Sequence, residues 1–476
     1  MDEIIGFGEI VLVVSLGLSL AVLSRSLTER LALPGAALFL VVSALASDLF
    51  PSLGNALSFT SVERIATVAL IVILFDGGMH IGWRRFRAAA VPIVSLGVVG
   101  TFATAGLVAL AAHALLDFSW TTAGLLGAAV APTDPAVVFS VLGNREIRGR
   151  SGTILEGESG ANDPVGIALM VGMIELATHA DETFWVVVRE FVVELSVGVV
   201  VGVVGARVLL LLLRRIELGE PALYPLRVLA AAGVLYGVAA VAHGSGFVAV
   251  FVAGVLVGDE AMPHKGVVES FNSSLASLAE ITAFVALGLT VDLTFLRHQG
   301  IWRDGLVLAL VLTFVARPLV VGLLLLPTRL RWGERMFVMW SGLKGAVPIL
   351  LAALAVTGGV DDAQKLYGIV FVVVLFSVVV QGTLVPHAAE RLKVPMRRIV
   401  HERTGTWTFV VRERSFAAGR PVRELPLGER AALGVLLRDG RPTELDGDTT
   451  LRPGDTVHVW SEEDDVPALR RIFEGP

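Results

Sequence analysis

Near the middle of the apolar run 119–143, the sequence reads Ala131-Pro132-Thr133-Asp134-Pro135. Proline lacks a backbone donor and disfavours helix at the residue before it, so these two prolines predict an unwound stretch. The run 334–356 contains Gly342-Leu343-Lys344-Gly345-Ala346-Val347-Pro348, which predicts a second break. A single break would be an ordinary proline kink of a membrane helix, but two breaks that each carry a charge indicate a binding site.

The composition around these breaks is that of a polytopic membrane protein. Of the 476 residues, 54% are hydrophobic and only 17% are charged, whereas soluble domains carry roughly 25% charged residues. This balance excludes an ordinary soluble enzyme and a nucleic-acid binder. The net charge of −6 predicts no polyanionic partner, and the absence of cysteine excludes thiolate metal sites.

Apolar runs that can cross a lipid bilayer, which takes about 20 residues, recur along the first 395 residues. We predict thirteen transmembrane helices, at residues 7–24, 31–47, 62–82, 89–116, 119–143, 152–178, 184–213, 225–243, 246–258, 272–296, 304–327, 334–356 and 367–389. Alternate loops carry fifteen Lys and Arg residues against five in the opposite loops, which predicts an outside N-terminus and a cytoplasmic C-terminus. The acidic opening Met1-Asp2-Glu3 predicts no cleavable signal peptide.

The charge density changes near residue 400. The last 76 residues hold 25 charged side chains, whereas the first 400 hold 57. We therefore predict an all-α membrane domain over residues 1–395 and a small α+β cytoplasmic domain over residues 402–476. In the latter, strands are expected at Trp407–Arg412 and Thr456–Trp460, a hairpin turn at Arg438-Asp439-Gly440 and a helix at Val466–Phe473.

The two predicted breaks lie seven spans apart, so their helices run in opposite directions through the membrane. That arrangement is expected of the inverted repeats of a secondary transporter, in which the substrate site lies where the broken helices cross.

A third polar stretch, Glu156-Gly157-Glu158-Ser159-Gly160-Ala161-Asn162-Asp163-Pro164, interrupts the apolar run 152–178. At about 1.5 Å per residue, Asp163 lies about 16 Å into a helix that begins at residue 152, near the bilayer centre. Ser159 lies one turn earlier on the same face. Together with Thr133 and Asp134, these side chains predict an oxygen-rich site for a hard monovalent cation.

Low dielectric and a second carboxylate both disfavour ionisation of Asp163, so it can hold either a proton or a cation near physiological pH. Competition of this kind is the central chemistry of an antiporter. The alternative is that Asp163 only caps a helix break near Pro164, which leaves Asp134, Ser159 and Thr133 unexplained.

Other charges inside the predicted spans need partners, because each costs roughly 2.5–3.5 kcal/mol on insertion scales. We expect Glu158 to pair with Lys344, and Arg317 to pair with Glu280 or to share the core acids. For Lys344 and Arg317, a structural role and a direct one stay equally open. Asp76 and Glu280 are interpreted first as structural charges, with Asp76 along a cytoplasmic funnel or at the site.

The three polar stretches together resemble the NhaP-type branch of the cation:proton antiporter superfamily, over residues 1–395. The resemblance implies an NhaA-like fold of thirteen helices, a homodimer, and a core domain that moves as an elevator. It implies that Asp163 carries the ion, with Thr133, Asp134 and Ser159 as fellow ligands. Asn162 before Asp163 resembles the electroneutral branch, which exchanges one proton for one cation.

The sequence departs from that family at one position. Members usually have arginine in place of Lys344, paired with the acid that matches Glu158. Lysine keeps the charge but lacks the bidentate fork of a guanidinium. We therefore expect this contact to be weaker here, or to be assisted by Arg317.

Residues 402–476 resemble the TrkA-C domain, through Leu425-Pro426-Leu427 and Gly454-Asp455 in this spacing. The resemblance implies dimerisation and a small regulatory ligand, for which cyclic di-AMP is a candidate. A β-rich tail that only stabilises the dimer is the alternative. No other cofactor is expected.

These observations predict an antiporter of a bacterial plasma membrane that exchanges K⁺ or Na⁺ for protons. The combination with a TrkA-C domain resembles potassium/proton antiporters and favours K⁺. The sequence leaves open a Na⁺/H⁺ antiporter, a cation channel gated by the tail, and an intramembrane hydrolase that uses Ser159 or the pair Asp134 and Asp163. For a channel, no filter-like loop is found. For a serine enzyme, no histidine or lysine lies near Ser159.

Overall fold

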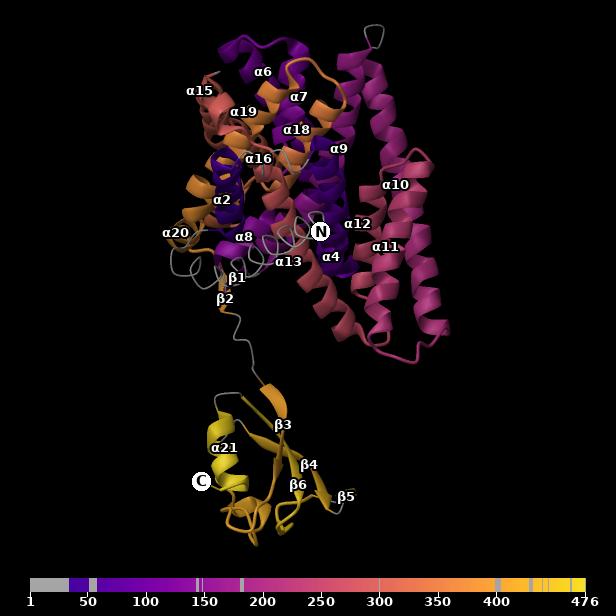
Figure 1. The fold of residues 1–476 in the computed structure, drawn as a ribbon, viewed down its shortest axis with the longest axis vertical. Helices are drawn as coiled ribbons and strands as arrows, with labels where there is room; N and C mark the ends of the chain where they lie inside the picture. The colour runs from indigo at the N-terminus through magenta and orange to yellow at the C-terminus, as the bar shows by residue number, and fades with distance from the viewer. Residues whose placement is uncertain are drawn as a thin grey trace, which may run out of the picture. The chain divides into compact units, whose positions relative to one another are not determined.

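The computed structural model describes residues 34–50, 58–142, 145–147, 149–179, 184–298, 300–398, 404–427, 431–438, 440–443, 445–462 and 465–475. The chain forms two compact units, Met1–Arg397 and Arg398–Pro476 (Figure 1). The first predicted span, 7–24, lies outside the described residues.

The first unit is built almost entirely of helices. Its first half contains α2 (Gly35–Leu49), α4 (Phe59–Ala88), α5 (Ala90–Val94), the π-helix η1 (Ser95–Gly100), α6 (Thr101–Leu116), α7 (Trp120–Val130), α8 (Pro135–Leu142), α9 (Arg150–Thr178) and α10 (Phe184–Arg215). Its second half contains α11 (Leu223–Val241), α12 (Gly246–Gly258), α13 (Lys265–Leu289), α14 (Leu293–His298), α15 (Ile301–Val311), the π-helix η2 (Leu312–Ala316), α16 (Arg317–Leu324), α17 (Trp332–Trp340), α18 (Ala346–Thr357), α19 (Ala363–Phe376), the π-helix η3 (Ser377–Gln381) and α20 (Val385–Arg391). Two short strands, β1 (Arg145–Ile147) and β2 (Met396–Arg398), pair with each other.

Each of the other twelve predicted spans overlaps one or more of these helices. Among the described residues, eight helices are long and apolar enough to cross a membrane, and three shorter apolar ones accompany them. In the described part of the chain, three helices have an N-cap serine whose side chain accepts a hydrogen bond from the backbone N–H three residues later, namely Ser58, Ser119 and Ser245. Such N-caps satisfy donors that the first helical turn leaves unpaired. The number of thirteen membrane crossings stays a prediction.

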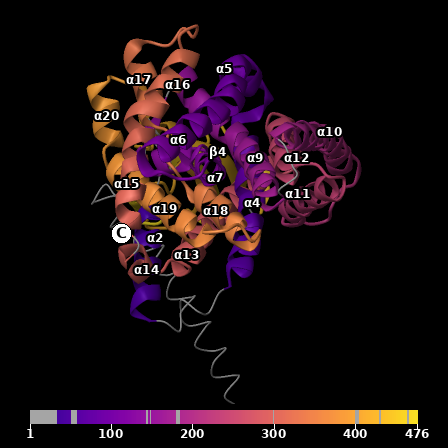
Figure 2. The same ribbon diagram turned by 90° about the horizontal axis from the view of Figure 1, so that it is seen from above.

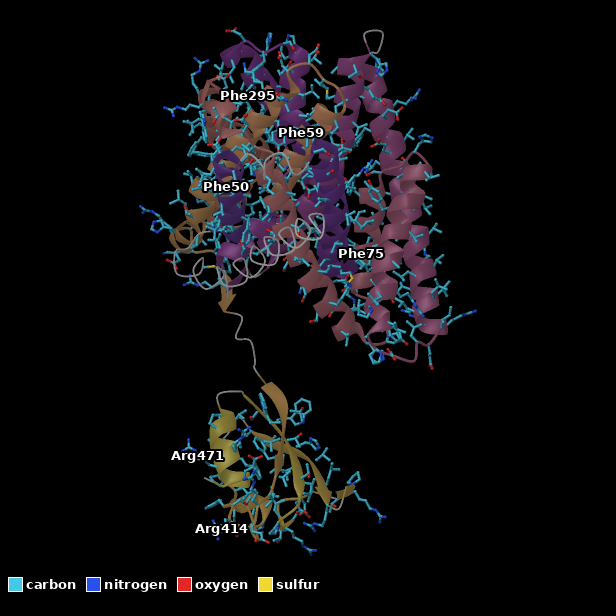
Figure 3. The ribbon with its side chains drawn as sticks, in the orientation of Figure 1. Phe50, Phe59, Phe75, Phe295, Arg414 and Arg471 are labelled. Carbon is cyan, nitrogen blue, oxygen red and sulfur yellow. The ribbon has the colours of Figure 1, made fainter. Side chains whose placement is uncertain are left out.

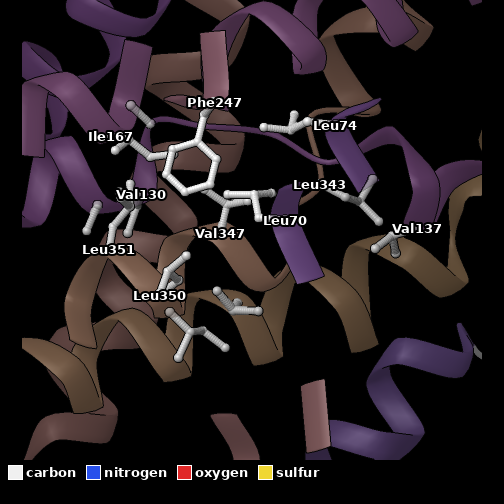
Figure 4. Close-up of a cluster of buried hydrophobic side chains, with 14 of the residues drawn as sticks. Leu70, Leu74, Val130, Val137, Ile167, Phe247, Leu343, Val347, Leu350 and Leu351 are labelled. Carbon is white, nitrogen blue, oxygen red and sulfur yellow. The ribbon is translucent and has the colours of Figure 1, made fainter. Parts of the chain in front are cut away.

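The helices of the first unit pack around a continuous apolar core. Figure 2 shows α10, α11 and α12 grouped on one side of the unit, with α4 and α9 next to them, and α4 packs closely on α12. A Cβ atom on Gly254 of α12 would lie 2.4 Å from the carbonyl oxygen of Phe75, so only glycine permits this approach. Figure 3 labels Phe75 on α4, and this side chain is 1% exposed. Figure 4 shows the apolar side chains of α4, α8, α9 and α18 meeting in the core.

The second unit is a four-stranded antiparallel sheet covered by one helix. The strands β3 (Thr404–Val410), β4 (Ala432–Arg438), β5 (Arg441–Thr443) and β6 (Thr456–Glu462) lie in the order β3-β6-β4-β5. A one-turn 3₁₀ helix spans Val422–Glu424, and α21 spans Val466–Phe473, as predicted. The rings of Phe409 and Phe473 stack with centroids 5.5 Å apart, which places α21 against the sheet.

Candidate ion-binding site

The first predicted break is present. Helix α7 ends at Val130, α8 begins at Pro135, and residues 131–134 between them are not helical. The backbone N–H of Ala136 donates to Asp134 Oδ1 at 2.8 Å, so the Asp134 carboxylate caps the first turn of α8. This contact fixes the carboxylate at the break, where the positive end of the α8 dipole favours negative charge.

The second break lies against the first one. Helix α17 ends at Trp340, α18 begins at Ala346, and residues 342–345 between them are not helical. The backbone N–H of Asp134 donates to the carbonyl oxygen of Leu343 at 2.8 Å. A Cβ atom on Gly345 would lie 1.9 Å from Asp134 Oδ2, so this close approach requires glycine. The two unwound stretches therefore meet at Asp134.

Lys344, in the second break, also contacts the first break through its side chain. Its side chain is 1% exposed, and its Nζ donates to the carbonyl oxygens of Ala131 and Pro132 at 2.9 and 2.8 Å. Unwinding the first break leaves these carbonyls without helical partners, and buried carbonyls need a donor. The ammonium group thus supplies the hydrogen bonds that the broken helix has lost.

The acids of the third polar stretch lie on a continuous helix. Helix α9 runs from Arg150 to Thr178 with Pro164 inside it, so Asp163 does not cap a helix break. Asp163 is 5% exposed, and its Oδ1 is buried without a hydrogen-bond donor. The Asn162 amide donates to Thr133 Oγ1 at 2.8 Å and so ties α9 to the first break.

A cavity of about 430 Å³ reaches these acids; we call it the acidic cavity. Its polar lining consists of Asp76 and His80 from α4, Asp134 and Ser140 at α8, Glu156, Ser159 and Asp163 from α9, and Ser273, Ser277 and Glu280 from α13. Thr133 and Asn162 do not line it. The structure therefore places Asp134, Ser159 and Asp163 around the same cavity. Thr133 does not line it, and its hydroxyl oxygen accepts a hydrogen bond from the Asn162 amide.

The predicted pair of Glu158 with Lys344 is wrong. The Arg317 guanidinium donates instead to both carboxylate oxygens of Glu158, at 2.5 and 3.1 Å, and both side chains are at most 5% exposed. The planar guanidinium matches a carboxylate in two parallel hydrogen bonds, which an ammonium group cannot do. Arg317 consequently does not pair with Glu280.

Asp76 lines the acidic cavity as a hydrogen-bonded acid. Its Oδ1 accepts from Ser273 Oγ at 3.2 Å, and its Oδ2 lies 3.3 Å from His80 Nδ1. It therefore links α4 to α13 on the wall of the cavity.

Sequence reasoning missed Ser377 and Gln381, which hold the second break. Ser377 Oγ accepts from the backbone N–H of Lys344 at 3.0 Å and donates to Gln381 Oε1, and Gln381 Nε2 donates to the carbonyl oxygen of Trp340 at 2.5 Å. The signal in the sequence is two polar residues four apart in the apolar run 367–389, which share one helix face.

Residues 8–391 match the transmembrane sodium/hydrogen exchanger family, which is most of the chain. The chain belongs to this family. Its members are cation/proton antiporters, so the exchanger is a transporter and not an enzyme, and the hydrolase alternative falls. Residues 408–474 match the TrkA-C domain.

Some relatives of this exchanger are named for K⁺ and others for Na⁺. A K(+)/H(+) antiporter NhaP2 from a Shewanella species is 30% identical over 96% of this chain and 81% of its own length. A K(+)/H(+) antiporter NhaP from Alkalimonas amylolytica is 33% identical over 81% of this chain and 67% of its own length. A Na(+)/H(+) antiporter NhaH from Halobacillus aidingensis is 27% identical over 80% of this chain and 98% of its own length.

A solved structure shares the fold of the exchanger. The sodium proton antiporter MjNhaP1 from Methanocaldococcus jannaschii matches with a TM-score of 0.69 and 23% identity, over 80% of this chain and all of that one.

Proposed function

We propose that this exchanger is an electroneutral K⁺/H⁺ antiporter of a bacterial plasma membrane, in which a proton and a cation compete for Asp163. The observation that carries the proposal is that the acidic cavity is lined by Asp163, one of whose carboxylate oxygens, Oδ1, is buried without a hydrogen-bond donor among the described residues. A buried acceptor of this kind needs either a proton of its own or a bound cation.

The oxygens around Asp163 supply the ligands of a hard cation. Asp134 and Ser159 line the same cavity, so a cation at Asp163 has two carboxylates and a hydroxyl within the same wall. Thr133 reaches the cation through its backbone or after release of Asn162, since its hydroxyl oxygen accepts from the Asn162 amide. Oxygen ligands of this kind suit K⁺ and Na⁺ and do not select transition metals.

The exchange is electroneutral because a single acid carries the charge. Asn162, beside Asp163 on α9, has an amide side chain that does not titrate and that serves as a hydrogen-bond donor to Thr133. One proton on Asp163 is therefore replaced by one monovalent cation, and the loaded site carries the same charge in both halves of the cycle.

Alternating access then requires the site to face the two sides of the membrane in turn. The two breaks that meet at Asp134 and Leu343 belong to the inverted repeats of a secondary transporter. The core that holds them moves as an elevator against the remaining helices, within a homodimer of chains with thirteen transmembrane helices, an outside N-terminus and a cytoplasmic C-terminus.

K⁺ is the proposed substrate because two of the relatives above carry K(+)/H(+) in their names and because the chain has a TrkA-C domain. Na⁺ is the second candidate, named for the relative from Halobacillus. We propose further that the TrkA-C domain regulates transport through a small ligand, with cyclic di-AMP as the candidate. Calorimetry with cyclic di-AMP on the full chain tests this, and absence of binding contradicts it.

The test of the proposal is dissipation of a pH gradient by added cation in proteoliposomes. Wild type is expected to respond to K⁺ more than to Na⁺, equally with the voltage clamped or free, and Asp163→Asn is expected to abolish the response. Glu190→Gln is the matched control, because Glu190 lies on α10, pairs with Arg189 and does not line the cavity. A stronger Na⁺ response reassigns the ion, exchange by Asp163→Asn contradicts the mechanism, and current without proton movement would indicate a channel.

A further inference from the structure

Helix α13 contributes a carboxylate, that of Glu280, to the lining of the acidic cavity. Ser273, Ser277 and Glu280 lie four and three residues apart on α13, so they share one helix face, and all three line the cavity. Helix α13 packs on α4, α2 and α11, with a smaller contact to α18 (Figure 1). Glu280 therefore lines the same cavity as Asp134 and Asp163, from a different helix.

Glu280 has no counter-ion in the part of the chain that the structure describes. No hydrogen bond or ion pair forms at its carboxylate there, and the nearby cations are engaged elsewhere. Arg317 binds Glu158, Lys344 holds the carbonyls of the first break, and His80 contacts Asp76. An unpaired acid in a membrane helix costs insertion free energy, and such residues usually mark the pathway of a transported ion.

We propose that Glu280 raises the affinity for the transported cation only while the site faces the acidic cavity. The inference rests on the proposed alternating access. When the core moves, Asp134 and Asp163 leave the wall formed by α4 and α13, and the cation loses the attraction of Glu280. A fixed negative charge on one wall attracts the cation in one state of the cycle and not in the other.

The acidic cavity belongs to the face of the membrane where the arginine-rich loops lie. On α4 its lining extends to His80 and Ile81, and Arg84 and Arg85 follow within four residues along the chain. By the positive-inside rule this end is cytoplasmic. Glu280 is therefore expected to act on cations that enter from the cytoplasm.

The test compares the KM for K⁺ on the two faces, in everted and right-side-out vesicles from cells without other antiporters. Glu280→Gln is expected to raise KM at the cytoplasmic face about tenfold, the size expected for one neighbouring charge across a hydrated site, and to leave KM at the outer face unchanged. Glu280→Asp should restore most of the affinity. Glu269→Gln is the control, because Glu269 lies on the same helix, outside the cavity, beside Lys265.

Equal changes of KM at both faces, or no change at either face, would overturn this role of Glu280. Failure of the proposed function gives a different result from failure of this inference. If the proposed function is wrong, exchange persists in Asp163→Asn, whatever the effect of Glu280→Gln. A Glu280→Gln protein that fails to fold is recognised by its loss from the membrane, and Glu280→Ala, which also removes the charge, then carries the comparison of the two faces.

Discussion

The backbone N–H of Asp134 donates a hydrogen bond to the carbonyl oxygen of Leu343, with 2.8 Å between the two atoms. This bond joins two helix breaks that lie about two hundred residues apart in the sequence. It also holds the backbone of Asp134 in place, and the carboxylate of this residue caps α8. The geometry of the ion site therefore depends on the close contact between the breaks, and small changes there should affect transport.

Gly345→Ala tests that contact directly. The new Cβ atom would lie 1.9 Å from Asp134 Oδ2, so the Asp134 side chain or the second break must shift. We expect exchange to fall at least about tenfold, the scale at which small misplacements of functional groups act. The rate of pH-gradient dissipation measures this, and Gly106→Ala on α6 is the control, because its Cβ atom meets nothing within 4 Å. Equal rates in the two variants would contradict the dependence on close contact.

Lys344→Met should destabilise the first break. The substitution leaves the carbonyl oxygens of Ala131 and Pro132 buried without the donor that now binds them. Each such group costs about 1–3 kcal/mol, so a drop in the melting temperature of the purified protein is expected. Lys344→Arg should lose less, because it keeps both the charge and the donors. A melting temperature unchanged in Lys344→Met would show that water replaces the ammonium group.

The buried pair of Glu158 and Arg317 predicts strong coupling between these residues. Glu158→Leu leaves the Arg317 charge without a counter-ion, and breaking a buried pair in this way costs about 3–5 kcal/mol. The double variant Glu158→Leu with Arg317→Met removes both charges and should be more stable than the single variant. A double-mutant cycle on thermal unfolding measures the coupling. Additive effects of the two substitutions would contradict a direct pair.

The TrkA-C domain should lose stability in acid. Burial alone would raise the pKa of Asp455, but the hydrogen bonds from Arg438 at 2.9 and 2.7 Å, the backbone N–H of Arg452 and the two arginine charges together outweigh burial and hold the pKa below the usual range. A carboxylate with a lowered pKa stabilises the fold above about pH 4. That contribution is lost as the pH falls through the lower value of the folded state.

Urea unfolding of residues 402–476 between pH 3 and pH 7 measures this effect. The free energy of unfolding should fall on acidification in wild type and less steeply in Asp455→Asn. Asp448→Asn is the control, because Asp448 forms an exposed pair with Arg423 and such pairs contribute about 0–1 kcal/mol. Parallel pH profiles for wild type and Asp455→Asn would contradict the role of the carboxylate.

The sequence predicts those features that local chemistry imposes. Prolines beside Thr133 and Asp134 require an unwound stretch wherever the helix lies, and the structure has it. Partner choice between distant helices does not follow from local chemistry. Both Lys344 and Arg317 were possible cations for Glu158, and the packing of η1 against both α9 and α16 accompanies the approach of the guanidinium to Glu158.

The hydrogen bonds that hold the second break were also beyond the sequence. The spacing of four residues places Ser377 and Gln381 on one helix face, but nothing in the local sequence identifies Lys344 and Trp340 as their partners. The same limit explains Thr133, which was expected at the ion but accepts the Asn162 amide in this state of the protein. Distances across the helix bundle decide these contacts.

Competition between proton and cation at Asp163 is the central claim, and the KM for K⁺ as a function of pH tests it most directly. If one site binds either ion, acidification should raise the KM, approaching tenfold per pH unit on the acidic side, while the maximal rate stays constant, because saturating cation displaces the proton. If instead the KM stays constant and the maximal rate falls with acidification, the proton and the cation bind at separate sites, and the account of Asp163 is wrong.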